Sequence, residues 1–98
     1  MIAVEELHKA FESRIRLGII SVLLVNDWVE FMELKETLSV TDGNLASHLA
    51  ALEKLAYIQV RKQFVGKKPN TSYAVTLEGG KAFNDHLAAL ERLIKASQ

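Results

Sequence analysis

The segment TDGNLASHLAALEKL, from Thr41 to Leu55, predicts an amphipathic helix whose outer face lacks both bulk and negative charge. Thr41 is a favourable N-cap residue, and Asp42 follows in the first turn, where the helix dipole stabilises a negative charge. Leucines recur at the i, i+4 and i+7 spacing of a buried helix face, namely Leu45, Leu49 and Leu52. The opposite face carries Gly43, Ser47, Ala50 and Lys54. A soluble helix usually carries Glu and Lys there, so this face indicates a large acidic partner lying close to it.

The residue types on this outer face suit contacts with duplex DNA. Gly43 lets the backbone come close to a phosphate or a base edge, and Asn44 can form a bidentate contact with adenine. Ser47 can reach a base or a phosphate, Lys54 suits a phosphate, and the free N–H groups of the helix N-terminus attract one. His48 lies nearer the core boundary, where a structural role and a phosphate contact both remain open. An Ala- and Ser-rich face also occurs where a helix packs against another protein.

The hydrophobic period changes from helical to alternating after this helix. In YIQVRKQFV, Ile58, Val60 and Phe64 point to one side, which predicts a half-buried strand. The segment GKKPN has turn chemistry, and TSYAVTL alternates again. The buried face of this second strand is expected to comprise Tyr73, Val75 and Leu77. Two strands around a lysine-rich turn predict a β-hairpin, in which Lys67 and Lys68 are candidate phosphate contacts.

Helical spacing dominates the first part of the chain. Val4, Leu7 and Phe11 predict an N-terminal helix that continues through RIRLGIISVLLV and ends at Asn26-Asp27. The segment VEFMELKETL predicts a short helix, and SVTDG is a turn before the helix that begins after Thr41. Two helices joined in this way form a helix-turn-helix.

The order of helix, helix, helix, hairpin and helix predicts an α+β, mainly α fold. We expect a winged helix-turn-helix with a three-helix core, a β-hairpin wing and a C-terminal dimerisation helix. The helix-turn-helix would span about residues 30–55, the wing about 57–77, and the last helix about 78–96, capped by Thr76. The chain has 98 residues, which suits a single domain over 1–98.

The last helix has an apolar stripe at the three- and four-residue spacing of a coiled-coil seam. The stripe consists of Phe83, Leu87, Leu90 and Ile94. In a single domain such a stripe is usually core, but here the middle of the chain already supplies a three-helix core. We therefore expect a dimer seam, which Val4, Leu7 and Phe11 would join. Two-fold symmetry would then place two recognition helices about 34 Å apart, one turn of DNA.

The motifs resemble those of a known family. SRIRLGII, followed by FMELKETLSVTDGNLASHLAALEKLAYIQVRKQFVGKKPNTSYAVTLEGGKAF, is similar to small winged helix-turn-helix transcriptional regulators related to the MarR and ArsR types, over roughly Ser13 to Leu90. The resemblance implies a homodimeric DNA-binding regulator. Its recognition helix, matching Thr41–Leu55, would enter the major groove. Its wing, matching VGKKPNTS, would reach an adjacent backbone or minor groove, which adds Thr41 and Thr71 to the candidate DNA contacts.

One departure from the family pattern falls between the recognition helix and the hairpin. Relatives usually have Gly before the aromatic residue that opens the hairpin, whereas this chain has Ala56. If position 56 adopts the left-handed conformation, an L-residue there costs roughly 1 kcal/mol.

Composition restricts the function classes. The formal net charge is zero, yet residues 41–76 carry five bases and two acids, a local charge of +3. The chain has no cysteine, which excludes disulfides, cysteine catalysis and an ArsR-like thiolate metal sensor, and fits a reducing cytoplasm. We find neither a secretory signal nor a membrane span in the sequence. The three histidines lie on separate segments and no Gly-rich phosphate loop is present, so we expect no enzyme, cofactor or metal site.

Two alternatives remain open from the sequence. A winged helix that binds proteins instead of DNA would carry apolar residues on the outer face of its recognition helix and a wing without basic charge. Separately, Trp28 in NDWVEF is expected to pack under the hairpin. A pocket near Trp28 and the dimer seam leads to the hypothesis of a small hydrophobic effector.

Overall fold

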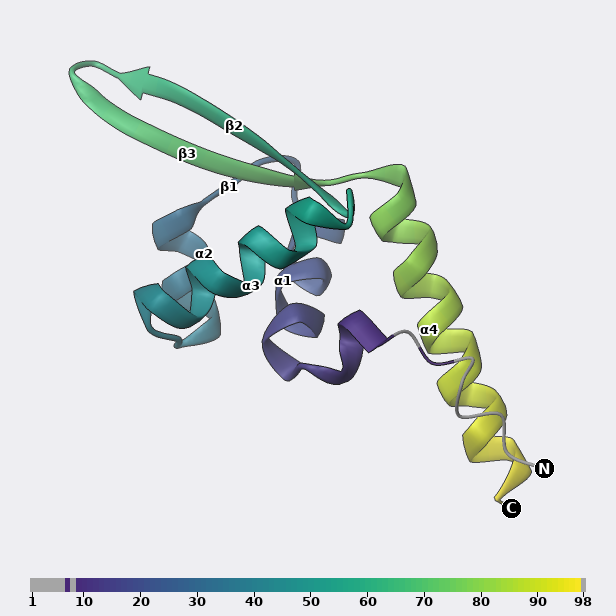
Figure 1. The fold of residues 1–98 in the computed structure, drawn as a ribbon. Helices are drawn as coiled ribbons and strands as arrows, with labels where there is room; N and C mark the ends of the chain where they lie inside the picture. The colour runs from purple at the N-terminus through teal and green to yellow at the C-terminus, as the bar shows by residue number, and fades with distance from the viewer. Residues whose placement is uncertain (1–6, 8, 98) are drawn as a thin grey trace.

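The computed structural model describes Leu7 and residues 9–97, which form a helical body, an antiparallel hairpin and a projecting C-terminal helix (Figure 1). The elements in chain order are the 3-10 helix η2 (Lys9–Glu12), α1 (Arg14–Leu24), β1 (Val29–Glu30), α2 (Phe31–Leu38), α3 (Asp42–Lys54), β2 (Ile58–Val65), β3 (Lys68–Val75) and α4 (Leu77–Ala96). This arrangement confirms the predicted winged helix-turn-helix fold.

The core lies where α1, α2 and α3 meet beneath the sheet. Each of these helices contributes side chains with almost no exposed surface, including Ile19 from α1, Leu34 from α2 and Leu45 from α3. The predicted leucine face of α3 is confirmed, because Leu49 and Leu52 are buried as well. Fixing α3 through this face leaves its opposite face toward solvent.

The N-terminal region differs from the single continuous helix that the spacing predicted. Ser13 is extended, and its hydroxyl accepts a hydrogen bond from the backbone N–H of Arg16 at 3.4 Å, so α1 begins as a new helix. Phe11, predicted at a dimer seam, is 1% exposed and belongs to the core of the single chain. Its ring stacks on Tyr57 and meets the edge of Phe83, with centroids 6.0 and 5.7 Å apart. Val4 lies outside the described residues.

The turn between α2 and α3 aligns the recognition helix. Ser39 ends α2 in the left-handed conformation, with φ of 53°, and its N–H reaches the carbonyl of Lys35. Thr41 then caps α3, since its hydroxyl accepts from the N–H of Asn44 at 3.2 Å, as the sequence predicted. The two caps set the direction in which the N-terminus of α3 leaves the body.

The sheet has three antiparallel strands in the order β1-β3-β2. The sequence pattern did not predict β1 and assigned Val29 to the following helix, but Val29 pairs with Tyr73 and is buried. The two long strands pair from Ile58 opposite Val75 to Val65 opposite Lys68, with Gly66 at φ of 65° in the tight turn.

Two predictions about the buried side of the hairpin were wrong. The alternation predicts Phe64 with Ile58 on a half-buried face, but the side chain of Phe64 is 73% exposed. It also predicts Leu77 on the second strand, but Leu77 is the first residue of α4 and 95% exposed. The hairpin extends beyond the helices, so alternation continues along β2 after the core that it faces has ended (Figure 1).

Hydrogen bonds of Thr76 join the start of the hairpin to the start of α4. Thr76 caps α4 by accepting from the N–H of Gly79 at 2.9 Å, and its hydroxyl donates to the carbonyl of Ala56 at 2.7 Å. Ala56 has φ of 63°, the left-handed conformation that favours glycine. A Cβ on Gly79 would stand 2.1 Å from the carbonyl oxygen of Tyr57, so only glycine fits at this junction. The contact fixes the wing relative to α4.

Candidate nucleic-acid interface

The outward face of α3 carries the small and polar residues that the sequence predicted. Gly43, Asn44, Ser47 and Lys54 are all exposed. A Cβ built on Gly43 would meet no atom within 4 Å, and the backbone there has no positive φ that would require glycine. Folding of the single chain therefore gives no reason for the missing side chain at position 43.

A groove borders the N-terminal end of this face. It is lined by Arg14, Ile15, Leu38, Ser39, Val40, Thr41 and Asn44. Arg14 is exposed and brings a positive charge from the start of α1 to the N-terminus of α3. Sequence spacing could not place Arg14 beside this face, because residues so distant along the chain are brought together only by the fold.

His48 is held by a residue of α1 at the edge of the α3 face. The Nε–H of Arg16 donates to Nδ1 of His48 at 3.0 Å, so Nδ1 is the acceptor and the ring is neutral in this contact. Burial, followed by the nearby Arg16 charge, lowers the pKa of His48. The structural role left open for His48 is therefore present, while its Nε2 remains available to carry the ring proton.

The acid in the first turn of α3 is paired with a base. Nζ of Lys35 lies 2.9 Å from Oδ1 of Asp42, which joins α2 to α3. Asp42 is largely exposed, so this pair contributes little to stability. Its electrostatic effect is more important here, because it offsets a negative charge beside the phosphate-attracting N-terminus of the helix.

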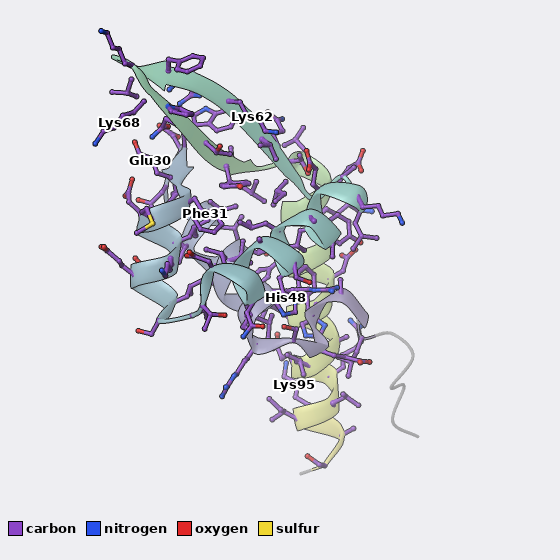
Figure 2. All side chains as sticks on the ribbon, turned by 60° about the vertical axis from the view of Figure 1, so that its left-hand side comes forward. Glu30, Phe31, His48, Lys62, Lys68 and Lys95 are labelled. Carbon is purple, nitrogen blue, oxygen red and sulfur yellow. The ribbon has the colours of Figure 1, made fainter. Side chains whose placement is uncertain are left out.

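The wing presents an acid-free basic surface. From Ile58 to Val75 the hairpin carries four bases and no Asp or Glu. Lys67 lies in the turn and Lys68 begins β3, and both are exposed. Figure 2 shows Lys62 and Lys68 on the hairpin and His48 on the neighbouring α3. Thr71, the last predicted wing contact, is half-buried and pairs with Lys62 across the strands.

The two adjacent bases of β2 are used differently. The sequence places Arg61 and Lys62 on opposite faces of the strand. The guanidinium of Arg61 lies 4.3 Å from the centroid of the Trp28 ring, a cation–π contact that ties the wing to the segment before β1. Lys62 lies on the other face of the strand, which packs on the core through Ile58 and Tyr73 at the end of the hairpin nearest the helices. Of these two basic residues, Lys62 is therefore the one on the same side of the sheet as the helical body.

The predicted dimer-seam residues of α4 differ in exposure. Phe83 is half-buried and packs against the core, and Leu90 is also half-buried. Leu87 and Ile94 are 44% and 58% exposed. Leu7 is half-buried. The buried residues of α4 end at Ala89, and in the later turns Leu90 is half-buried while Ile94 is exposed.

A shallow depression lies beside Trp28, between the end of α1 and the base of the hairpin. Its lining residues are Leu23, Leu24, Asn26, Asp27, Trp28, Gln59, Ala74 and Val75. The effector hypothesis for this region stays a prediction.

Metal clusters and membrane spans are not features of the described part of the chain. Among residues 7 and 9–97, no three His, Asp or Glu side chains are grouped so that they could hold a metal ion. None of the helices within the same residues combines the length and apolarity needed to cross a bilayer.

Comparisons with known proteins agree with this geometry. The family described as winged helix DNA-binding domain matches residues 15–94. An uncharacterized protein of Methanocaldococcus jannaschii is 33% identical over 87 residues, which cover 89% of this chain and 95% of that protein. A transcriptional regulator homologue from Pyrococcus horikoshii has a similar structure, with a TM-score of 0.78, 29% identity and coverage of 97% and 99% of the two chains.

A MarR structure shows the same fold at lower identity. A mutant of MarR from E. coli superposes with a TM-score of 0.73 and 17% identity, over 89% of this chain and 63% of MarR. The predicted resemblance to small winged helix-turn-helix regulators is thereby confirmed.

Proposed function

The chain belongs to the family of winged helix DNA-binding domains, and on that premise we propose that it regulates transcription by binding duplex DNA as a homodimer. In this proposal α3 lies in the major groove, and the wing contacts the adjacent backbone or minor groove. The observation that carries it is the outer face of α3, where Gly43 leaves open space that folding does not require.

Each predicted contact residue of α3 has its own role in this binding mode. Asn44 contacts a base edge, with adenine as its preferred partner, and Ser47 contacts a base or a phosphate. The backbone at Thr41 and Gly43 approaches a phosphate at the helix N-terminus. Lys54, at the far end of α3, is a phosphate contact. His48 supports the face through Arg16 and can donate to a phosphate from Nε2.

The wing contributes mainly electrostatic affinity. Lys67 and Lys68 neutralise phosphates, and Thr71 lies next to Lys62 on the strand pair. Phosphate contacts position a protein on the duplex without reading sequence, whereas base contacts from α3 specify it.

The homodimer forms through the uncovered part of α4. Leu87 and Ile94 are its central contacts, with Leu90 and Phe83 continuing the stripe toward the core. An exposed apolar stripe at this spacing is buried most simply by the same stripe of a second copy. Two recognition helices would then face successive major grooves on one side of the duplex.

Site selection tests the base contact directly. A duplex site is first selected from a random pool with the wild-type protein, and affinities for all single-base variants are then measured. Asn44→Ala should reduce discrimination at one position by about 1–3 kcal/mol and leave the other positions unchanged. Ser47→Ala serves as the matched control from the next turn and should alter a different position or only overall affinity. An unchanged ranking with Asn44→Ala would show that Asn44 does not read a base.

A further inference from the structure

Phe64 is an exposed aromatic residue near the tip of the wing. Its side chain is 73% exposed, although a Phe ring is among the largest apolar groups that a protein can bury. Its partner across the strands is Pro69, which leaves most of the ring uncovered. The core of the single chain therefore does not account for an aromatic residue at this position.

The surroundings of Phe64 indicate a polyanion. Lys62 lies two residues earlier on the same strand face, and Lys67 and Lys68 follow in and after the turn. The hairpin carries no acid from Ile58 to Val75. An apolar surface flanked by bases on a hairpin that itself carries no acid fits a ligand that offers both an apolar groove and flanking phosphates.

Strand alternation fixes the side to which the ring points. Phe64 shares a strand face with Ile58, which is buried against the helical body. Figure 1 shows the hairpin extending past the helices. Near the tip, the strand face that carries Ile58 and Phe64 therefore no longer packs on the helical body. Val65, the next residue, points to the opposite face and is also exposed.

We propose that Phe64 and Pro69 form an apolar wedge that enters the minor groove of the duplex bound by α3. The inference rests on the proposed function and deepens it, because it assigns the wing an apolar contact with sugar and base edges in addition to its phosphate contacts. Apolar side chains inserted in a minor groove partly unstack a base step and bend the duplex toward the major groove. The lysines on either side hold the phosphates that border the groove.

The experiment compares Phe64→Ala with Val65→Ala on the full chain. Affinity for a random-sequence duplex pool is measured by fluorescence anisotropy across a salt series, and bending by energy transfer between dyes at the duplex ends. Phe64→Ala should bind about tenfold more weakly, with an unchanged salt slope and less bending. Val65→Ala, on the other strand face, should behave like the wild type. Both variants should keep the wild-type circular dichroism spectrum, because both side chains are exposed.

The outcomes separate the wedge from the proposed function. If the wild type binds and bends the duplex and Phe64→Ala does both equally well, the wedge is overturned while the proposed function stands. If the wild type binds no duplex, both are overturned. Molar mass by light scattering is measured on the same samples, and a lower mass for Phe64→Ala would assign the ring to a contact between copies and overturn the wedge.

Discussion

Gly43 and Gly79 show how one residue type serves two purposes in this chain. At Gly79 a Cβ would stand 2.1 Å from the carbonyl oxygen of Tyr57, so folding requires glycine there. At Gly43 a Cβ would meet nothing within 4 Å. Glycine lowers helix stability relative to alanine, so the residue at position 43 is a cost to the isolated protein. Close approach of DNA to the α3 backbone would explain why glycine, and not alanine, stands at position 43.

Replacement of these glycines separates folding from binding. Gly43→Ala should raise the free energy of unfolding by up to about 1 kcal/mol and weaken duplex binding, because the added methyl group stands between α3 and the DNA. Gly79→Ala should lower the free energy of unfolding, since the backbone at Tyr57 must move. Urea denaturation and anisotropy measure the two effects. Duplex binding by Gly43→Ala as tight as that of the wild type would show that the backbone of α3 does not approach the DNA closely at this position.

His48 gives the stability of the protein a pH dependence of known sign. Burial and Arg16 lower the pKa of His48 in the folded state, so the unfolded chain binds more protons at this site. The stabilising contribution of the Arg16–His48 contact is therefore present above the unfolded pKa of about 6.5 and disappears as pH falls below it.

Thermal denaturation of His48→Ala beside the wild type checks this sign. Between about pH 7.5 and 5.5, the Tm of the wild type should fall more than that of the variant, and the difference between them should shrink. The other histidines are the same in both proteins, so their contributions cancel in the comparison. Parallel curves over this range would mean that His48 does not titrate with the lowered pKa.

At the scale of the elements, the wing and α3 should contribute differently to binding. The double variant Lys67→Ala with Lys68→Ala should weaken binding to all sequences about equally. It should also make the slope of log affinity against log salt shallower, by about 0.9 for each phosphate that the variant no longer neutralises. Anisotropy across a salt series provides the slope, and Lys81→Ala on α4 is a control outside the wing. If the slope is unchanged in the double variant, the two lysines are solvated and not bound to phosphate.

The elements themselves could be predicted where their signals are local. The cap at Thr41, the leucine face of α3 and the lysine-rich turn are each encoded within a few residues, and the structure contains all three. β1 could not be predicted, because two residues carry no period and Val29 is defined as a strand only by its distant partner Tyr73. Alternation along β2 identified the strand face of Phe64 but not the point at which the core ends, so the predicted burial of Phe64 was wrong.

The same difference between local signals and contacts with distant residues applies to the candidate site. Its exposed residues on α3 and the wing follow from helical and strand periods in the sequence. The pairs that support them, Arg16 with His48 and Lys35 with Asp42, join different helices. No spacing within one helix predicts such pairs, because they depend on how α1, α2 and α3 pack together. Phe11 is likewise a core residue and not a seam residue because its aromatic neighbours come from distant parts of the chain.

At the scale of the whole molecule, the proposed homodimer would assemble through α4. The chain measures 56 × 25 × 21 Å, and α4 extends from the body in Figure 1. Leu87→Glu with Ile94→Glu should halve the molar mass and keep the fold, since both side chains are exposed in the single chain. Light scattering and circular dichroism measure these two results. An unchanged mass would place the contact between copies elsewhere.

The central claim, that the chain binds duplex DNA as a dimer through several phosphate contacts, is tested most directly by one combined measurement. Binding of the purified protein to a random duplex library is followed by anisotropy across a salt series, with molar mass measured on the same sample. The predicted result is a dimer whose log affinity falls with log salt by about 0.9 for each phosphate engaged, and therefore steeply. A dimer with no salt-dependent binding to any duplex would contradict the claim.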